Sequence, residues 1–330
     1  MSKLLLVQKK LSQACQKRFE EQFDSQILQR LYKGFAEERK TVIRINTLKT
    51  SLSDVMDILR KHHIHFERVA FLTNSLILKH TQEKYFESKK NEEAFQLYNS
   101  GSIYFQGISS QIPVLFLHAK TDEKILDVSS APGSKTTQIG IAMQNQGELV
   151  ANEIDAIRYE RLKYNLEKQG ITNAKTVLGD GIALGYDFPE YFDKILLDAP
   201  CSAEGRICVQ NPRTYRFWTE KNIIKNAKLQ RRLFQSAIKA LKPGGTLVYS
   251  TCTLAPEENE MIVDWALEKF NGENENKKIK LLDCQLDFNH LLPILTSFQG
   301  KTFSKEVQKT LKASPSDISE GFFIAVFKKL

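Results

Sequence analysis

The spacing of apolar and polar positions changes along this chain of 330 residues and predicts two kinds of structure. From about residue 111, short β-type runs alternate with stretches of helical periodicity. The predicted strands are 124–128, 147–152, 174–178, 192–197 and 245–250, and the predicted helices are 112–117, 135–144, 155–169, 221–241 and 256–270. Such alternation is typical of a parallel sheet with helices on both faces. We also expect a closing antiparallel pair of strands at 307–311 and 322–328, after a polar loop at 271–280.

The first 110 residues have a different pattern. Helical periodicity covers residues 1–40, and 41–46 alternates like a strand. Ser51 or Ser53 is placed to cap a short helix, and 66–71 and 75–78 have strand character. This order predicts a helical start followed by a small α+β module, ferredoxin-like or RRM-like. The aromatic signature of an RRM is not evident, so stacking of RNA bases on sheet aromatics is not supported.

Composition and charge narrow the class of protein. Hydrophobic residues make up 42% and charged residues 26%, which is ordinary for a globular chain, and no apolar stretch approaches the roughly 18 residues of a membrane span. The apolar start is too short for a signal peptide, so we expect a cytoplasmic protein. The sequence does not determine the oligomeric state, and a monomer is the expectation. Residues 1–110 hold 18 lysines and arginines against 12 acidic residues, whereas the remainder holds 29 against 27. This asymmetry predicts that residues 1–110 bind a polyanion such as RNA.

Metal and disulfide chemistry are not predicted. Five cysteines with irregular spacing form neither a disulfide framework nor a zinc pattern. His62, His63 and His65 are close in sequence, but no thiol or carboxylate follows at ligand spacing.

Polar residues follow each of the five predicted parallel strands, and ligands of open α/β sheets bind at these carboxyl ends. The first strand runs into a small-residue loop before a helix, where backbone amides approach a ligand closely. This loop consists of Ser129, Ser130, Ala131, Pro132, Gly133, Ser134 and Lys135. Glu153 ends the second strand, twenty residues after Gly133, which is the separation expected for a carboxylate on ribose hydroxyls. Asp180 follows the third strand, where it is placed to accept from an adenine amino group.

These carboxylates predict an adenosine cofactor. A dinucleotide needs a GxGxxG turn for its pyrophosphate, and the loop lacks one. S-Adenosylmethionine, which has no pyrophosphate, is the better candidate.

The fourth and fifth strands end at Asp198-Ala199-Pro200-Cys201-Ser202 and Tyr249-Ser250-Thr251-Cys252. Methyl transfer to oxygen or nitrogen needs no enzyme nucleophile, but transfer to C5 of cytosine needs a thiolate that adds to C6. A carboxylate beside ring N3, here Asp198, would stabilise the developing charge. Either cysteine fits the role of nucleophile on these grounds, and a buried, inert cysteine is the alternative reading of both.

These two segments, together with Ser130-Ala131-Pro132-Gly133-Ser134-Lys135-Thr136, resemble the signatures of the RNA cytosine-C5 methyltransferases of the NOP/Sun type. The likeness runs from about Arg44 to Ala325. It implies a Rossmann-like S-adenosylmethionine methyltransferase sheet at 111–330, with the smaller α+β RNA-binding domain at 1–110.

The resemblance also assigns roles to residues. It implies that Cys252 is the nucleophile and that Cys201 assists release of the methylated base. It further implies that the Ser129–Lys135 loop, Glu153, Asp180 and Asp198 contact the cofactor, with Lys135 and Asp198 also near the target base. The sequence departs from the family pattern at three positions, where Ser129 replaces a frequent Cys and Ser134 and Ala203 replace Gly.

The predicted activity is therefore methylation of cytosine C5 in RNA, rRNA or tRNA, with S-adenosylmethionine as cofactor. One alternative is an amino-methyltransferase, but Pro200-Cys201 and the second thiol argue against it. The other is a non-catalytic RNA-binding or ribosome-assembly factor with a methylase fold. Its expected sign, loss of a cofactor carboxylate or of the nucleophile, is absent.

Overall fold

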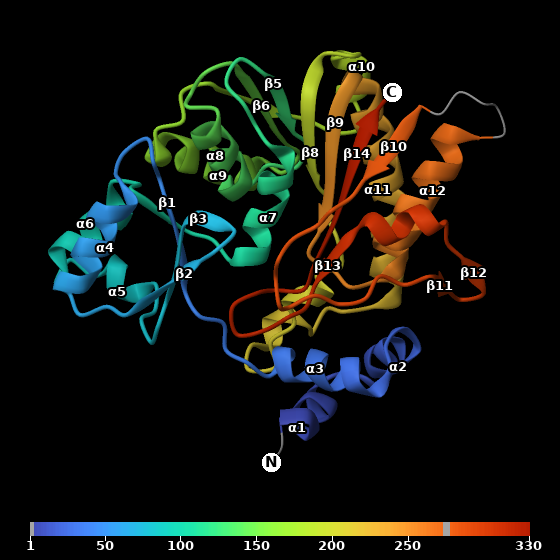
Figure 1. Ribbon diagram of the computed structural model, residues 1–330, viewed down its shortest axis with the longest axis horizontal. Helices are drawn as coiled ribbons and strands as arrows, with labels where there is room; N and C mark the ends of the chain where they lie inside the picture. The colour runs from blue at the N-terminus through green and yellow to red at the C-terminus, as the bar shows by residue number, and fades with distance from the viewer. Residues whose placement is uncertain (1–2, 273–277) are drawn as a thin grey trace.

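The computed structural model describes residues 3–272 and 278–330, and its larger part is a mixed sheet with helices on both faces (Figure 1). The strands of the parallel part are β5 (Lys124–Asp127), β6 (Glu148–Glu153), β7 (Ala174–Leu178), β8 (Phe192–Asp198) and β9 (Leu241–Thr251). They lie in the order β9-β8-β5-β6-β7. Sequence and structure agree on these strands because parallel strands buried on both faces are nearly continuous apolar runs.

The far edge of the sheet is antiparallel. The strand β14 (Phe322–Lys329) pairs with β9 on one side and with β10 (Ile279–Leu282) on the other, and β13 (Leu311–Ala313) pairs with its start. The predicted closing pair therefore exists, but its first strand is 311–313, because 305–309 forms the 3₁₀ helix η4 (Lys305–Lys309). The polar loop predicted at 271–280 is shorter than expected, since β10 begins at Ile279; residues 273–277 lie outside the described part of the chain.

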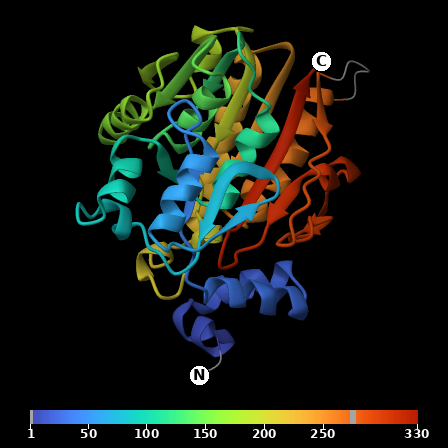
Figure 2. The ribbon, with the colours of Figure 1, turned by 60° about the vertical axis from the view of Figure 1, so that its left-hand side comes forward.

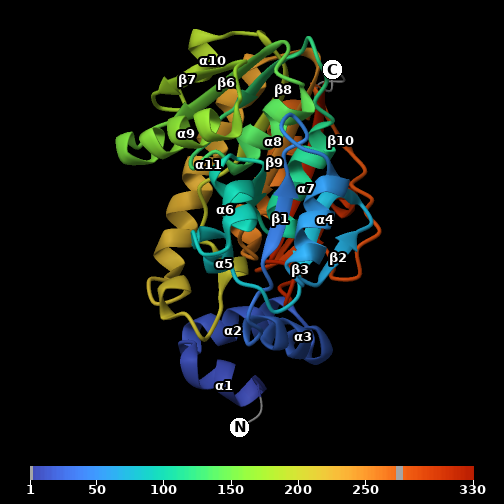
Figure 3. The same ribbon diagram turned by 90° about the vertical axis from the view of Figure 1, so that its left-hand side faces the viewer.

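The two faces of the sheet are covered by different helices (Figures 1 and 3). One face packs against α11 (Glu220–Ala240) and α12 (Glu260–Asn271), and the other against α7 (Ile108–Leu117), α8 (Ser134–Ala142) and α9 (Ala156–Gln169). Successive residues of one strand point to opposite faces of the sheet. Leu126 packs in the hydrophobic core under α11 and α12, and Ile125 packs in the core under α7 and α8. The short elements beside these are α10 (Leu184–Asp187), η1 (Glu204–Arg206), η2 (Pro212–Thr214), η3 (Pro256–Glu258), β11 (Ser297–Phe298) and β12 (Lys301–Thr302).

A separate antiparallel sheet of four strands lies beside α7 (Figure 2). Its order is β2-β3-β1-β4, from β1 (Val42–Ile45), β2 (Phe66–Val69), β3 (Leu72–Leu78) and β4 (Ile103–Phe105), and its helices are α4 (Leu52–Lys61), α5 (Lys84–Glu87) and α6 (Glu92–Asn99). Ser51 caps α4 in a reciprocal box with Asp54. The elements α5, α6 and β4 were not predicted. His62 pairs with Glu93 across 3.0 Å.

The helical start does not pack on the small sheet. It forms α1 (Lys3–Lys10), α2 (Gln13–Gln22) and α3 (Ser25–Phe35), which lie below the large domain in Figure 1. Their apolar side chains share a core with Ile207, Val209 and Leu254 from loops next to the large sheet. Arg18 of α2 and Glu257 of η3 form a largely buried ion pair at 2.7 Å. These helices therefore support the loops at the carboxyl ends of the strands.

Candidate active site

The loop after β5 turns sharply and enters α8. Gly133 has φ of +106°, a conformation that side chains disfavour. A Cβ at this position would lie 3.2 Å from Leu162 Cδ1, a tight contact that a small shift of this side chain can relieve, so the conformation is the main reason for glycine here. Ser134 is the first residue of α8 and has ordinary helical geometry, so this departure from the family pattern is free of strain.

Ala203 is different, because it has φ of +60°. Its left-handed conformation carries a cost of about 1–2 kcal/mol for a residue with a Cβ. This departure from the family pattern therefore introduces strain beside Cys201.

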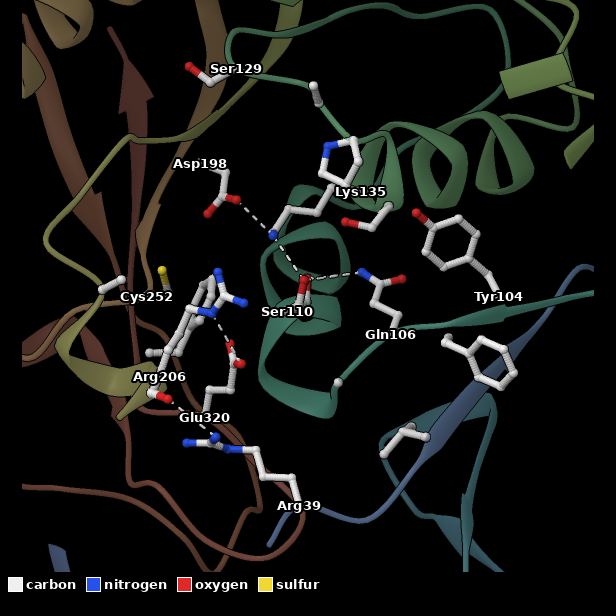
Figure 4. Close-up of a pocket in the computed structure, with 18 of the residues that line it drawn as sticks. Arg39, Tyr104, Gln106, Ser110, Ser129, Lys135, Asp198, Arg206, Cys252 and Glu320 are labelled. Carbon is white, nitrogen blue, oxygen red and sulfur yellow. Dashed lines mark hydrogen bonds and ion pairs between the residues drawn. The ribbon is translucent and has the colours of Figure 1, made fainter. Parts of the chain in front are cut away.

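Two thiols and an ion pair meet in one cavity of about 740 Å³. Figure 4 shows Cys252 of this group beside the pair formed by Lys135 and Asp198. The parallel pairing of β8 with β9 aligns Asp198 with Ser250 and so carries the following Cys201 and Cys252 to neighbouring positions. Their sulfur atoms lie 3.3 Å apart. Lys135 Nζ lies 2.7 Å from Asp198 Oδ2, and the Ser250 hydroxyl donates to Asp198 Oδ1 at 2.8 Å. The segments that follow β5, β8 and β9, which the sequence singled out, thus meet in this cavity.

The electrostatics of the cavity favour a charged lysine and a protonated thiol. Burial lowers the pKa of Lys135, but the adjoining Asp198 carboxylate more than offsets this, and the net shift is upward. The hydrogen bond to Cys252 and burial raise the pKa of Cys201 well above its ordinary value. A protonated Cys201 can donate to the Cys252 sulfur, 3.3 Å away.

Asp127, at the end of β5, also lines the cavity. Burial raises its pKa to about 7, with nearby Asp198 adding to the rise, while the Thr136 hydroxyl donates to it at 2.7 Å and opposes the shift. A cationic ligand in the cavity would favour the ionised form of this carboxyl.

A buried carboxyl holds the segment that carries Cys201. Glu258 of η3 accepts a hydrogen bond from the Ser202 amide at 3.0 Å and one from Gln230 Nε2 at 2.8 Å. The same Gln230 amide group donates to the Pro200 carbonyl. Burial raises the pKa of Glu258 to about 8, against the opposing effect of these hydrogen bonds. Glu258 and Gln230 thus fix the backbone on both sides of Cys201.

Only some of the remaining residues predicted to bind the cofactor line the cavity. The cavity is lined by Ser129, Ser130, Ala131, Pro132, Ser134 and Lys135 of the loop. Glu153 is only 2% exposed, and its carboxylate accepts from the amides of Ala131, Ile154 and Asp155. Asp180 is exposed and accepts from the Ile182 amide at 2.9 Å. Gly133, Glu153 and Asp180 are not among the residues lining this cavity.

Several residues in the cavity were not singled out from the sequence. Ser110 of α7 accepts a hydrogen bond from Lys135 Nζ at 2.9 Å, and Gln106 donates to Ser110 (Figure 4). Arg206 pairs with Glu320 at 3.4 Å, and Arg39 donates to the Arg206 carbonyl. These residues follow no strand end of the parallel sheet and carry no motif spacing, so sequence offered no signal for them.

Comparisons with known proteins identify the family of the chain. The model of the 16S rRNA methyltransferase RsmB/F family matches residues 114–328. The chain is 37% identical over 295 residues to ribosomal RNA small subunit methyltransferase F of Citrobacter koseri, covering 87% of this chain and 56% of that protein. It is also 37% identical over 290 residues to the tRNA (cytosine(49)-C(5))-methyltransferase of Pyrococcus abyssi, covering 87% of each. The chain thus spans about half the length of the rRNA methyltransferase relative.

Solved structures share the whole architecture. A methyltransferase homolog from Pyrococcus horikoshii superposes with a TM-score of 0.82 at 30% identity, covering all of both chains. NSun6 from the same organism gives a TM-score of 0.79 over 97% of this chain and 98% of that one, and at 24% identity it shows the fold alone. The predicted fold class and the family resemblance are both confirmed. The chain belongs to the RsmB/F methyltransferase family.

Proposed function

We propose that this protein methylates C5 of a cytosine in RNA, rRNA or tRNA, through a covalent bond between Cys252 and C6 of the base. The observation that carries the proposal is the meeting of two thiols, 3.3 Å apart, with the Lys135–Asp198 ion pair in one cavity. Methylation of oxygen or nitrogen needs no enzyme nucleophile, so paired thiols are not expected in the active site of such an enzyme. They are not expected in a non-catalytic binding protein either.

The residues present fit S-adenosylmethionine as the cofactor. The cavity of about 740 Å³ lies within the roughly 300–1,000 Å³ typical of small-molecule sites. Asp127 and Asp198 are carboxylates suited to a cationic ligand, and the loop Ser129–Lys135 supplies backbone groups at the start of α8. We propose that these residues hold the cofactor together with Glu153 and Asp180. When bound, S-adenosylmethionine supplies an electrophilic methyl group on its sulfonium.

The side chains then have separate tasks. The Cys252 thiolate adds to C6, which turns C5 into a nucleophilic enamine carbon. Asp198, oriented by Lys135 and Ser250, faces ring N3 and stabilises the charge that develops there. After methylation a base removes the C5 proton, the C6–sulfur bond breaks, and Cys252 regains its thiolate. Cys201, whose pKa is raised, keeps a proton beside the departing sulfur and so assists this release.

The target base must leave its stack to reach the cavity, so a single-stranded or flipped cytosine is expected. The relatives named above act on rRNA and on tRNA by their names, and this supports RNA as the substrate class. We propose that the RNA-binding part and the catalytic part divide between Phe105, where the small sheet ends, and Ile108, where α7 begins, because the boundary expected at residue 110 lies within α7. We propose that the protein acts as a monomer.

Bisulfite sequencing of total RNA from cells with and without the gene tests this function. We expect one or more cytosines to lose C5 methylation on deletion and to regain it with the wild-type gene but not with Cys252→Ala. RNA in which no 5-methylcytosine depends on the gene would overturn the proposal.

A further inference from the structure

A second cavity adjoins the catalytic one. It has a volume of about 370 Å³, and Cys201 and Ala203 line both cavities. Its other walls come from the rest of the segment after β8, from the segment before α11 and from the first turns of that helix, at the lower end of α11 in Figure 3. We call it the Phe217 cavity. A strand whose target base enters the catalytic cavity would bring a neighbouring nucleotide to this place.

The Phe217 cavity lies in the most basic segment of the catalytic part. Residues 213–232 hold seven lysines and arginines and one acid, Glu220, whereas residues 111–330 as a whole hold 29 against 27. Arg213 and Lys225 line the cavity itself. Within residues 3–272 and 278–330, no ion pair is formed by five exposed cations of this segment, Arg213, Arg216, Lys221, Lys225 and Lys228. Exposed cations without acidic partners are suited to phosphate groups.

Phe217 is a large apolar side chain presented to solvent on a fixed backbone. It is 68% exposed. The next residue, Trp218, is half-buried and donates from Nε1 to the buried Glu204 at 2.8 Å, while Asn222 donates to the Phe217 carbonyl. Arg216 lies with its guanidinium carbon 4.4 Å from the centre of the Phe217 ring. An exposed aromatic ring next to cations is a platform on which a base can stack.

Amide side chains complete the walls. Asn222 and Asn226 both line the cavity. Among the described residues the Asn226 amide has no hydrogen-bond partner, so both its donor and its acceptor are open to the edge of a base. The cavity thus combines a stacking surface, cations and a free amide, which together match a nucleotide.

We propose that the Phe217 cavity binds the nucleotide adjacent to the target cytidine, with its base on Phe217 and its phosphate between Arg213 and Lys225. This inference rests on the proposed function for the identity of the bound chain as RNA. The Phe217 cavity would thus give the enzyme a preference for the nucleotide next to the methylated cytosine. This preference would come from the catalytic part rather than from residues 1–110.

The test measures binding of a short single-stranded oligouridylate with one central cytosine, together with two versions that carry an abasic residue on one or the other side of the cytosine. Base stacking is worth about 1–3 kcal/mol, so Phe217→Ala should weaken binding by about 5- to 150-fold, whereas Phe217→Tyr should retain it. The wild type should bind one of the two abasic RNAs more weakly than the intact RNA, by a similar factor. Phe217→Ala should bind that abasic RNA and the intact RNA equally well. If the abasic residue weakens binding to the wild type and to Phe217→Ala by the same factor, the base does not stack on this ring.

Salt dependence tests the phosphate contact. Lys225→Gln should reduce the slope of log affinity against log salt by about 0.7, the value for one contact with a single strand. Lys280→Gln on the distant strand β10 and Tyr186→Ala, exposed on α10, are matched controls and should leave binding unchanged. An unchanged slope for Lys225→Gln excludes the phosphate contact.

The same variants separate this inference from the proposed function. If Phe217→Ala weakens binding but the wild type forms no 5-methylcytosine, the cavity binds RNA and the proposed reaction is wrong. If the wild type methylates RNA and Phe217→Ala and Lys225→Gln bind and methylate it as well, the proposed nucleotide site is wrong and the reaction stands. Both variants are at exposed positions, and their thermal unfolding checks that they fold.

Discussion

Cys201 Sγ and Cys252 Sγ lie 3.3 Å apart, although 51 residues separate them along the chain. The pairing of β8 with β9 produces this contact, and Glu258 with Gln230 holds the backbone on either side of Cys201. The hydrogen bond between the thiols contributes most to the raised pKa of Cys201. The two thiols share this hydrogen bond, and it is the roles proposed for them in the reaction that make them unequal.

This inequality predicts opposite outcomes for two equal substitutions. Cys252→Ala should abolish both methylation and any covalent protein–RNA species, because no adduct can start. Cys201→Ala should permit attack and methyl transfer but impair release, so that a covalent complex accumulates as a slow band on a denaturing gel.

General loss of stability cannot explain opposite results from the same change in side chain. If Cys201→Ala prevents the adduct and Cys252→Ala traps it, the roles are reversed. Normal methylation by both variants would rule out covalent catalysis.

Removal of the Asp198 charge should slow the chemical step. Asp198→Asn keeps the shape but leaves Lys135 without its anion, and single-turnover methylation should fall by about 10²–10³-fold, as for loss of one group that stabilises transition-state charge. Ser250→Ala removes only a hydrogen bond to Asp198 and should cost far less. A rate for Asp198→Asn equal to that of Ser250→Ala would exclude the electrostatic role.

The predicted adenine contact of Asp180 should be modest. Because this carboxylate is exposed, Asp180→Ala should weaken S-adenosylmethionine binding by about 1 kcal/mol, the worth of one ordinary hydrogen bond, as measured by calorimetry. Unchanged affinity in a folded variant would remove Asp180 from the cofactor site.

Glu258 should make stability depend on pH. Its pKa is raised from 4.5 to about 8, so between these values the folded protein holds a proton that the unfolded chain has released. Its contribution to stability is fully present below about pH 4.5 and is lost as pH rises toward 8, at a rate of at most about 1.4 kcal/mol per pH unit. Glu258→Gln, which cannot titrate, should show a shallower decline of unfolding free energy over pH 5–8. A decline as steep as that of the wild type would contradict the assignment.

Ala203 offers a stabilising substitution. Ala203→Gly relieves the cost of φ at +60° but gains freedom in the unfolded chain, so the free energy of unfolding should rise by about 0.5–1 kcal/mol. Ala142, exposed in the last turn of α8, is the matched control, and Ala142→Gly should lower stability by a similar amount. If denaturant unfolding shows a change in the free energy of unfolding of the same sign for both variants, Ala203 is not strained.

The sequence was most informative where apolar runs end in reactive residues. The strand ends at Asp198, Cys201 and Cys252 were predicted to converge, because carboxyl ends of parallel strands meet at one edge of a sheet. Glu258 and Arg206 were missed because tertiary contacts alone bring them to the site.

The fold was predictable for the same reason, and its gaps have a physical cause. The three-residue strand β4 and the four-residue helix α5 are too short to show a period. The breaks between α1, α2 and α3 were also missed, because the apolar stripe continues across the caps at Ser12 and Asp24.

Two buried polar residues, one in β1 and one just after it, connect the small sheet to the large domain by hydrogen bonds. Arg44 is buried and donates to Gln106 and to Thr137 at 2.8 Å, and the Asn46 amide donates to the Gln169 carbonyl at 2.8 Å. Burial lowers the pKa of Arg44 to about 9, which shows how poorly this charge is solvated.

This junction has a consequence for the growing chain on the ribosome. Arg44 is synthesised 93 residues before Thr137, and Asn46 is synthesised 123 residues before Gln169. The strands of the small sheet are complete by Phe105, so the sheet can form early, as amino-terminal units generally do during synthesis. The Arg44 contact remains unmade until α8 has emerged, and the Asn46 contact remains unmade until α9 has emerged. A nascent chain that stalls before α9 therefore exposes an unfinished surface to chaperones and proteases.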